Sequence, residues 1–127
     1  MPRVTLQLLA GEFAICRLAP AEPVPAWAGS AVFSAGLRTR DELCVLCPAE
    51  NVPVGVKHER GWRILALAGP FAFTETGILA SVLTPLAAAG VSILAQSTFD
   101  TDYVWVPAGQ LDAALQALAA AGHAIRR

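Results

Sequence analysis

The sequence predicts an α+β fold in which two helices cover one face of an antiparallel sheet. Apolar residues recur at helical spacing in two segments, over Ile78–Leu86 and Leu111–Leu118. Short apolar runs rich in branched and aromatic side chains surround these segments and predict strands. Their order is strand–helix–strand–strand–helix, followed by a short final strand. Such an order is typical of a sheet with its helices packed on one side.

The first half of the chain is predicted to contain strands and loops but no helix. Residues 19–29 carry three prolines, which excludes a regular helix there. Residues 48–61 combine Pro48, Pro53 and Gly55 with a charged run, so we expect a connector. The strands predicted in this half are Arg3–Leu9, Glu12–Leu18, Ala31–Ala35 and Glu42–Cys47.

The second half has clearer boundaries. A strand over Trp62–Ala68 is broken by Gly69-Pro70. The first helix has Thr76 as a candidate N-cap, ends before Gly90, and contains Pro85, which predicts a kink. The remaining predicted elements are strands Val91–Gln96 and Tyr103–Val106, a hairpin turn around Phe99–Thr101, a second helix ended by Gly122, and a last strand His123–Arg126.

Composition limits the classes of protein to consider. The 127 residues are 55% hydrophobic and 15% charged, which excludes a disordered chain and predicts a well-buried core. The net charge of −1 indicates neither a nucleic-acid partner nor an anionic membrane surface. No apolar run reaches the roughly 18 residues of a membrane span. The N-terminal stretch MPRVTLQLLAGEF lacks the features of a signal peptide, so we expect a cytoplasmic protein.

The cysteines and histidines do not form a recognisable metal site. The odd number of cysteines argues against a disulfide framework. Cys44 and Cys47 have C-x-x-C spacing, but residues i and i+3 of a strand point to opposite faces. We therefore expect Cys16, Cys44 and Cys47 to be reduced core thiols. His58 and His123 are isolated and are interpreted as surface histidines.

A weak internal repeat divides the chain. Ala10–Ala14 (AGEFA) resembles Ala68–Ala72 (AGPFA), and each follows an apolar strand. Further on, Asp41 and Asp102 each precede another apolar strand. The chain is therefore interpreted as two copies of one unit, the first with a proline-rich loop where the second has a helix.

Three motifs in the second copy carry a family resemblance. They are G-x-x-x-F-x-x-T-G-I from Gly69, P-L-A-x-x-G-V-S-I from Pro85, and S-T-F-x-T-D-Y-x-x-V from Ser97. On these motifs, residues 62–120 resemble an ACT domain of the kind found in small bacterial tandem-ACT proteins and in animal cytosolic arginine sensors. The segment TRDELCV also resembles the degenerate first unit of the bacterial proteins. The resemblance implies a ferredoxin-like βαββα fold in two tandem units, a degenerate one over 1–58 and an ACT domain over 59–127.

The resemblance also implies a regulatory module rather than an enzyme. ACT domains bind amino acids or other small molecules, usually where two units join their sheets edge to edge. Only the second unit carries complete motifs, so a full site needs the same unit of another subunit and the expected assembly is a homodimer. A regulated partner protein is a further expectation, and the sequence does not identify it.

The segment that opens the first helix supplies one group of candidate ligand contacts. Free backbone N–H groups at a helix N-terminus suit a carboxylate, and Gly77 allows close approach to the backbone. Glu75 is a candidate acceptor for an ammonium or a cationic side chain. On chemistry alone, an equal alternative is that Thr74 or Thr76 caps the helix and Glu75 complements its dipole. With the resemblance added, the predicted ligand-binding residues are Phe73, Glu75, Thr76, Gly77 and Ile78.

The polar hairpin supplies a second group. Its Asp and Thr side chains are typical of a turn that satisfies its own backbone. Asp100 and Asp102 have no nearby His, so we interpret them as neither a metal site nor an acid–base pair. The resemblance assigns Thr98, Phe99 and Asp102 to the ligand pocket, with Ser92 and Ile93 contributed by the adjoining unit.

Two other functions remain to be compared. One is a structural or protein-interaction module that keeps the fold with a vestigial pocket. The other is a small enzyme, for which the chain offers no set of nucleophile, base and orienting group. We therefore expect no catalytic residue, no metal and no cofactor.

Overall fold

The structure, a computed structural model, describes residues 1–127 and falls into two units. One unit joins Met1–Leu9 to Arg63–Arg127, and the other comprises Ala10–Trp62. This division differs from the predicted boundary between residues 58 and 59. The reason is that the first strand pairs with strands of the C-terminal half, so the chain enters that unit, leaves it and returns.

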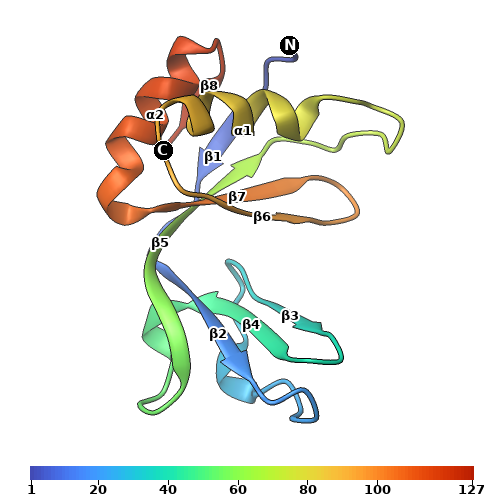
Figure 1. Cartoon of the computed structure of the whole chain (residues 1–127). Helices are drawn as coiled ribbons and strands as arrows, with labels where there is room; N and C mark the ends of the chain where they lie inside the picture. Colours follow the sequence, from blue (N-terminus) through green and yellow to red (C-terminus); the bar gives the residue numbers. More distant parts are fainter. The chain divides into compact units, whose positions relative to one another are not determined.

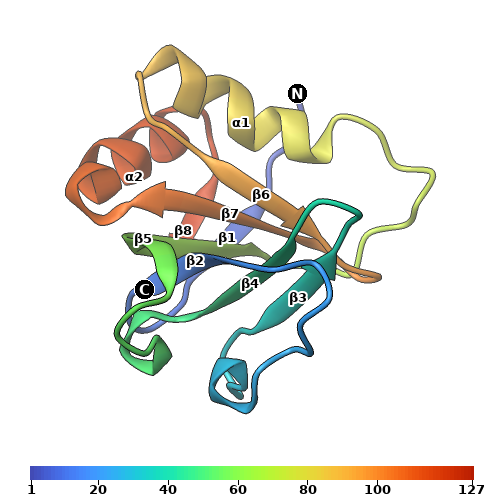
Figure 2. The same ribbon diagram turned by 60° about the horizontal axis from the view of Figure 1, so that its bottom comes forward.

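The larger unit has the predicted order of elements (Figure 1). Strand β1 pairs antiparallel to β5 and parallel to β8, and β7 pairs with both β5 and β6. The parallel β1–β8 pair corrects the expectation of a purely antiparallel sheet. Both helices lie on the same face of this sheet (Figures 1 and 2). The elements are β1 Thr5–Leu8, β5 Lys57–Leu67, α1 Ile78–Ala88, β6 Leu94–Ser97, β7 Asp102–Pro107, α2 Leu111–Ala120 and β8 Ala124–Arg126.

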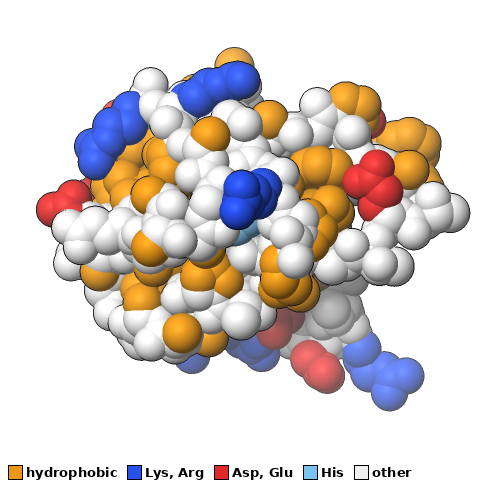
Figure 3. Space-filling view, turned by 90° about the horizontal axis from the view of Figure 1, so that it is seen from above, with side chains coloured by type: hydrophobic (Ala, Val, Ile, Leu, Met, Phe, Trp, Pro, Cys, Tyr) orange, Lys and Arg blue, Asp and Glu red, His pale blue; other side chains and the backbone are white.

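One apolar core joins the helices to the sheet. Alternate residues of β7, Val104 and Val106, pack with Leu65 and Leu67 of β5. Leu86 of α1 is fully buried in the same core. Seen from the helix side, apolar patches lie between scattered charged side chains (Figure 3). Neither helix has the length and apolar character that a membrane crossing requires.

The helix ends follow the glycines. Gly90 has φ +74° after α1, its N–H donates to the Ala87 carbonyl, and the next N–H, of Val91, donates to the Leu86 carbonyl. Gly122 ends α2 with the same pair of hydrogen bonds. Both are Schellman caps, in which glycine adopts a left-handed conformation without strain. The predicted ends of the two helices are therefore confirmed.

The start of α1 differs from the prediction. The N-cap is Gly77, with φ +77°, and no side chain caps the helix. Thr76 is therefore not the cap, because the capping residue takes a left-handed conformation that glycine adopts much more readily than threonine.

Pro85 lies inside α1 and has an unexpected partner in His123. Proline has no N–H, so the carbonyl of Ser81, four residues earlier, receives no helical hydrogen bond from it. The Nε2 of His123 lies 2.8 Å from that carbonyl oxygen, and Nδ1 accepts a hydrogen bond from the Val4 N–H at 3.1 Å. His123 is only 6% exposed, which corrects its interpretation as a surface histidine.

The smaller unit is built from strands and single 3-10 turns. Strand β2 pairs antiparallel with β4 and with the first part of β5, and β3 pairs with β4. The proline-rich segment forms a 3-10 turn at Ala26–Ala28 and no regular helix, as predicted. The remaining strands and turn are β2 Phe13–Leu18, β3 Ala35–Arg38, β4 Leu43–Pro48 and the 3-10 turn Ala49–Asn51.

Two strand predictions in this unit are wrong. The weak strand expected at Ala31–Ala35 lies later, at Ala35–Arg38, because pairing with β4 selects the residues that continue into the hairpin. The charged run Lys57–Arg60 belongs to β5 instead of a connector. Its pairing with β2 outweighs the low strand propensity of charged residues.

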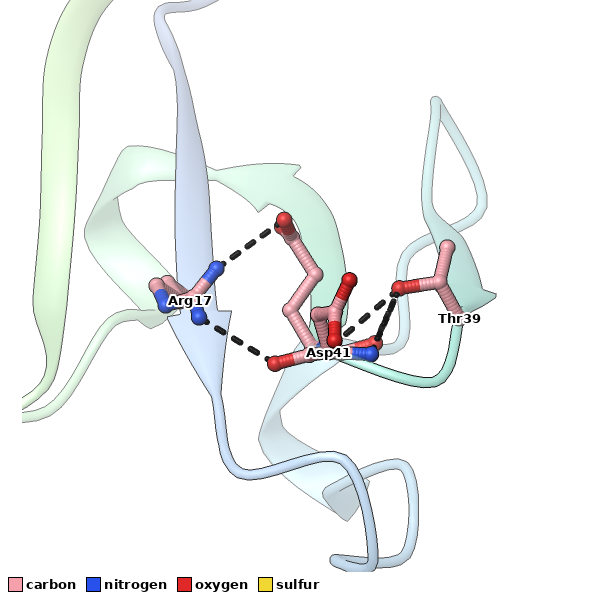
Figure 4. A network of polar contacts seen from close by, with 4 residues as sticks. Arg17, Thr39 and Asp41 are labelled. Atoms are coloured by element: carbon pink, nitrogen blue, oxygen red, sulfur yellow. Dashed lines mark hydrogen bonds and ion pairs between the residues drawn. The ribbon is translucent and has the colours of Figure 1, made fainter.

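The β3–β4 hairpin is held to β2 by one arginine (Figure 4). Arg17 forms an ion pair with Glu42 at 2.9 Å and donates to the Asp41 carbonyl at 3.1 Å. The Thr39 hydroxyl accepts hydrogen bonds from the N–H groups of Asp41 and Glu42. Asp41, the counterpart of Asp102 in the internal repeat, therefore serves the turn.

All three cysteines are free thiols, and the prediction that they lie in the core is correct for two of them and wrong for Cys44. Cys16 and Cys47 are buried, whereas Cys44 is half-buried and lies outside that core. Burial, reinforced by the neighbouring Cys47, raises the pKa of Cys16 to about 12. The two cysteines of the C-x-x-C motif therefore have different surroundings, as expected for i and i+3 of a strand.

Candidate functional site

The larger unit contains a hollow of about 200 Å³ between the loop before α1 and the β6–β7 hairpin. The loop contributes Phe73 and Glu75, and Ile78 opens the helix beside them. The hairpin contributes most of the opposite wall. The full set of lining residues is Phe71, Ala72, Phe73, Glu75, Ile78, Ser97, Thr98, Phe99, Asp100, Thr101 and Asp102.

The two walls are tied together at their base. The Phe71 N–H donates to the Asp100 carbonyl at 2.9 Å, and the Thr101 hydroxyl donates to the Leu67 carbonyl at 2.6 Å. A Cβ added to Gly69 would lie 2.9 Å from the Asp100 carbonyl oxygen, so only glycine fits there. These contacts fix the hairpin against the strand end from which the loop departs.

The hairpin itself is a closed turn. Thr98 and Thr101 exchange hydrogen bonds: the Thr98 N–H donates to the Thr101 carbonyl at 2.8 Å, and the Thr101 N–H donates to the Thr98 hydroxyl at 3.3 Å. Across the hairpin, Ser97 is paired with Asp102, and the Ser97 hydroxyl donates to the Asp102 carboxylate. The turn interpretation of the polar block is correct, and the same block forms a wall of the hollow.

The charges that line the hollow are all negative. They are the carboxylates of Glu75, Asp100 and Asp102, and no lysine or arginine lines it. None of the three forms an ion pair with a side chain of the protein, whose one ion pair joins Arg17 and Glu42. Such a site attracts a cationic group.

Two aromatic rings stand at the hollow and remain open to water. Phe73 and Phe99 are 77% and 81% exposed, and their ring centroids lie 5.1 Å apart in an edge-to-face arrangement. Large exposed apolar side chains that gather in one place mark a surface that a ligand or another protein covers. The charge and the apolar rings of the hollow are therefore complementary to a small molecule with a cationic group and an apolar part.

The structure brings together six of the ten predicted site residues and leaves four outside. Thr76 and Gly77 do not line the hollow, although Gly77 sets the start of α1. The Ser92 N–H donates to the Gln110 side chain at 3.3 Å, and Ile93 packs against the apolar core. The six residues in the hollow are Phe73, Glu75, Ile78, Thr98, Phe99 and Asp102.

Sequence reasoning missed five lining residues: Phe71, Ala72, Ser97, Asp100 and Thr101. Ser97 could have been predicted from the hairpin register, which places it opposite the predicted site residue Asp102. No local pattern indicated the contact of Thr101 with the end of β5, because it joins residues 34 apart in the chain.

The larger unit, with two helices on one face of its sheet and a small hollow at the loop before α1, has a fold of the ferredoxin-like type. The profile of the ACT domain family matches residues 57–120, and the profile of a separate N-terminal domain matches residues 11–55. The chain belongs to the ACT domain family. ACT domains are regulatory modules that bind small molecules, and the predicted family and fold are confirmed.

Known proteins resemble the chain to different extents. An Agobacterium tumefaciens protein of known crystal structure is 41% identical to this chain in sequence. Its structure matches with a TM-score of 0.93, over 98% of this chain and 93% of that chain. The regulatory subunit of aspartate kinase from Thermus thermophilus shares the fold, at 14% identity and a TM-score of 0.63, over 90% of this chain and 94% of that chain. The Homo sapiens cytosolic arginine sensor for mTORC1 subunit 1 is 38% identical over 58 residues, 45% of this chain. That match spans only 18% of the human protein.

Proposed function

We propose that the chain is a non-catalytic regulatory module that binds an amino acid in the hollow between the loop before α1 and the β6–β7 hairpin. The observation that supports this most directly is the set of three carboxylates without an ion-pair partner, Glu75, Asp100 and Asp102, around about 200 Å³ of space. Pockets for drug-sized ligands occupy about 300–1,000 Å³, so this hollow suits a smaller molecule.

Each part of an amino acid has a partner there. The carboxylates accept hydrogen bonds from an ammonium or from a cationic side chain. The first N–H groups of α1 point out of a helix start that no side chain caps, and they suit a carboxylate. The rings of Phe73 and Phe99 offer apolar and cation–π contact.

We propose further that the complete site forms in a homodimer, in which Ser92 and Ile93 of the second subunit approach the hollow of the first. The two exposed phenylalanines support this, because a second subunit would cover them. A regulated partner protein would then respond to the liganded dimer. Light scattering tests the assembly, since the chain mass of 13.3 kDa should double.

Thermal unfolding against the twenty amino acids, at millimolar concentration, tests ligand binding. A ligand at about 100 times its Kd adds roughly 2.7 kcal/mol, which raises Tm by about 10 °C for a domain of this size. Glu75→Gln and Asp102→Asn should remove the shift, whereas the exposed control Glu59→Gln should keep it. If no amino acid raises Tm, or if the shift survives in both pocket variants, the proposed site is wrong.

The exposed pair Phe73 and Phe99 also favours a second candidate, a protein-interaction module with a vestigial pocket. In that case no amino acid stabilises the protein, and Phe99→Ser removes an association that Glu75→Gln leaves intact.

A further inference from the structure

A second and larger cavity lies in the smaller unit, whose helical elements are the two 3-10 turns Ala26–Ala28 and Ala49–Asn51. Its volume is about 370 Å³. It is bounded by the turn before β2, the segment after the proline-rich loop, the end of β4 and one residue of β5. The lining residues are Ala10, Gly11, Glu12, Phe13, Ser30, Val32, Pro48, Ala49, Glu50 and Arg60.

A β-bulge brings Arg60 to this cavity. Phe13 pairs with Trp62 and Ile15 pairs with Glu59, so two steps along β2 face three steps along β5. The extra residue falls at Arg60 and Gly61, and Gly61 has φ +84°. Bulges of this kind redirect a side chain and are frequent beside functional sites. The bulge, which regular strand pairing would lack, therefore sets the position of Arg60 at the cavity.

The guanidinium of Arg60 keeps most of its hydrogen-bonding capacity. One N–H donates to the Ala49 carbonyl at 2.7 Å, which fixes the side chain at the cavity wall. It forms no ion pair, since the one ion pair of the chain joins Arg17 and Glu42. A guanidinium carries five N–H donors in a planar arrangement that matches a carboxylate. Donors therefore remain for an anionic group in the cavity.

Opposite charge is present in the same cavity and is also unpaired. Glu12 and Glu50 line it and form no ion pair with Arg60 or with any other cation. The Ser30 hydroxyl accepts from the Val32 N–H at 3.1 Å, which leaves its O–H free to donate. The floor includes the buried ring of Phe13, which contacts Phe33 edge to face.

From this geometry we propose that the cavity of the smaller unit is a second binding site, selective for a small zwitterion. Arg60 binds its anionic group, and Glu12 and Glu50 bind its cationic group. The short apolar body of the ligand rests on Phe13. This charge arrangement differs from that of the hollow in the larger unit, which has carboxylates and no basic side chain.

Chemical-shift titration of the full-length protein, labelled with ¹⁵N, tests this proposal. The probes are glycylglycine as the zwitterion, acetate as the anion alone and ethylammonium as the cation alone. We expect glycylglycine to shift the amides of Gly11, Ser30 and Glu50 saturably. Acetate and ethylammonium should bind at least ten-fold more weakly, because each satisfies only one charge. Shifts confined to Thr98–Asp102 would place the ligand in the other unit and overturn the proposal.

Variants separate binding from folding. Arg60→Gln should weaken glycylglycine binding by at least ten-fold, the loss of about one charged hydrogen bond. The matched control Arg40→Gln makes the same change at an exposed position outside the cavity and should leave binding unchanged. Because Arg60 also holds the Ala49 carbonyl, Glu50→Gln serves as the second variant; it should weaken binding several-fold without changing the spectrum elsewhere. Unchanged affinity in Glu50→Gln, or in a folded Arg60→Gln protein, refutes the site.

Discussion

His123 connects three segments of the larger unit, and its removal should destabilise the protein. Its Nδ1 accepts from the Val4 N–H at 3.1 Å, and its Nε2 donates to the Ser81 carbonyl at 2.8 Å. One ring nitrogen accepts and the other donates, which is the arrangement of a neutral imidazole. The three segments are the approach to β1, the middle of α1 and the approach to β8.

The magnitude follows from these two hydrogen bonds. His123→Ala leaves one buried N–H and one buried carbonyl without a partner, at about 1–3 kcal/mol each. The expected loss in the free energy of unfolding is therefore roughly 2–6 kcal/mol. With a urea m-value of about 2 kcal/mol/M, the unfolding midpoint should fall by about 1–3 M.

Urea unfolding followed by circular dichroism at constant pH measures this loss. His58→Ala is the matched control, because the His58 side chain makes its hydrogen bond to the Val56 carbonyl two residues away, and its loss should cost below about 1 kcal/mol. A midpoint for His123→Ala that falls no further than that of His58→Ala refutes the reasoning.

A double-mutant cycle then tests the link to Pro85. Pro85→Ala restores an N–H that can donate to the Ser81 carbonyl within α1. When His123 is absent, this N–H is the only new partner for the Ser81 carbonyl. Pro85→Ala should therefore stabilise the His123→Ala protein by about 1 kcal/mol more than it stabilises the wild type. Equal effects in both backgrounds would show that His123 does not compensate for the proline.

Three further predictions concern the hairpin and the thiols. Gly69→Ala places a Cβ 2.9 Å from the Asp100 carbonyl oxygen and should cost about 1–3 kcal/mol in thermal unfolding, whereas the control Gly109→Ala meets nothing within 4 Å and should be near neutral. Because burial raises the pKa of Cys16 to about 12 from 9.0, the folded protein binds more protons than the unfolded chain between these values, and stability should fall as pH rises through that window. Cys16→Ala should flatten this fall in urea midpoints measured from pH 8 to 10, and a slope identical to wild type would contradict the assignment. The buried Cys47 should resist alkylation until the protein unfolds.

The hairpin and the helix ends show how far local patterns reach. Gly90 and Gly122 ended the two helices where predicted, because a left-handed cap depends on residues within one turn. The polar hairpin was placed correctly from its turn residues. The cap at Gly77 was missed, because the sequence does not reveal the sign of φ at a glycine that follows a good capping residue.

The candidate site was predicted in part for a related reason. Its two walls come from segments that the motifs identified, so six of the predicted residues lie in the hollow. The base of the hollow depends on contacts such as that between Thr101 and Leu67, 34 residues apart, which no motif records. Arg60 was assigned to a connector, because a charged run followed by glycine is typical of a loop and does not by itself predict a β-bulge.

The sequence by itself determined the class of the fold, the order of the elements and the family, because these depend on periodicity, on glycine and proline positions, and on short motifs. Only the tertiary structure decided where β1 lies and what His123 does. β1 completes the sheet of the C-terminal half by pairing with β5 and β8, and His123 joins Val4 across 119 residues. Such partners are chosen by backbone hydrogen bonds and burial between segments remote in the chain, and every apolar strand of similar length presents the same local pattern.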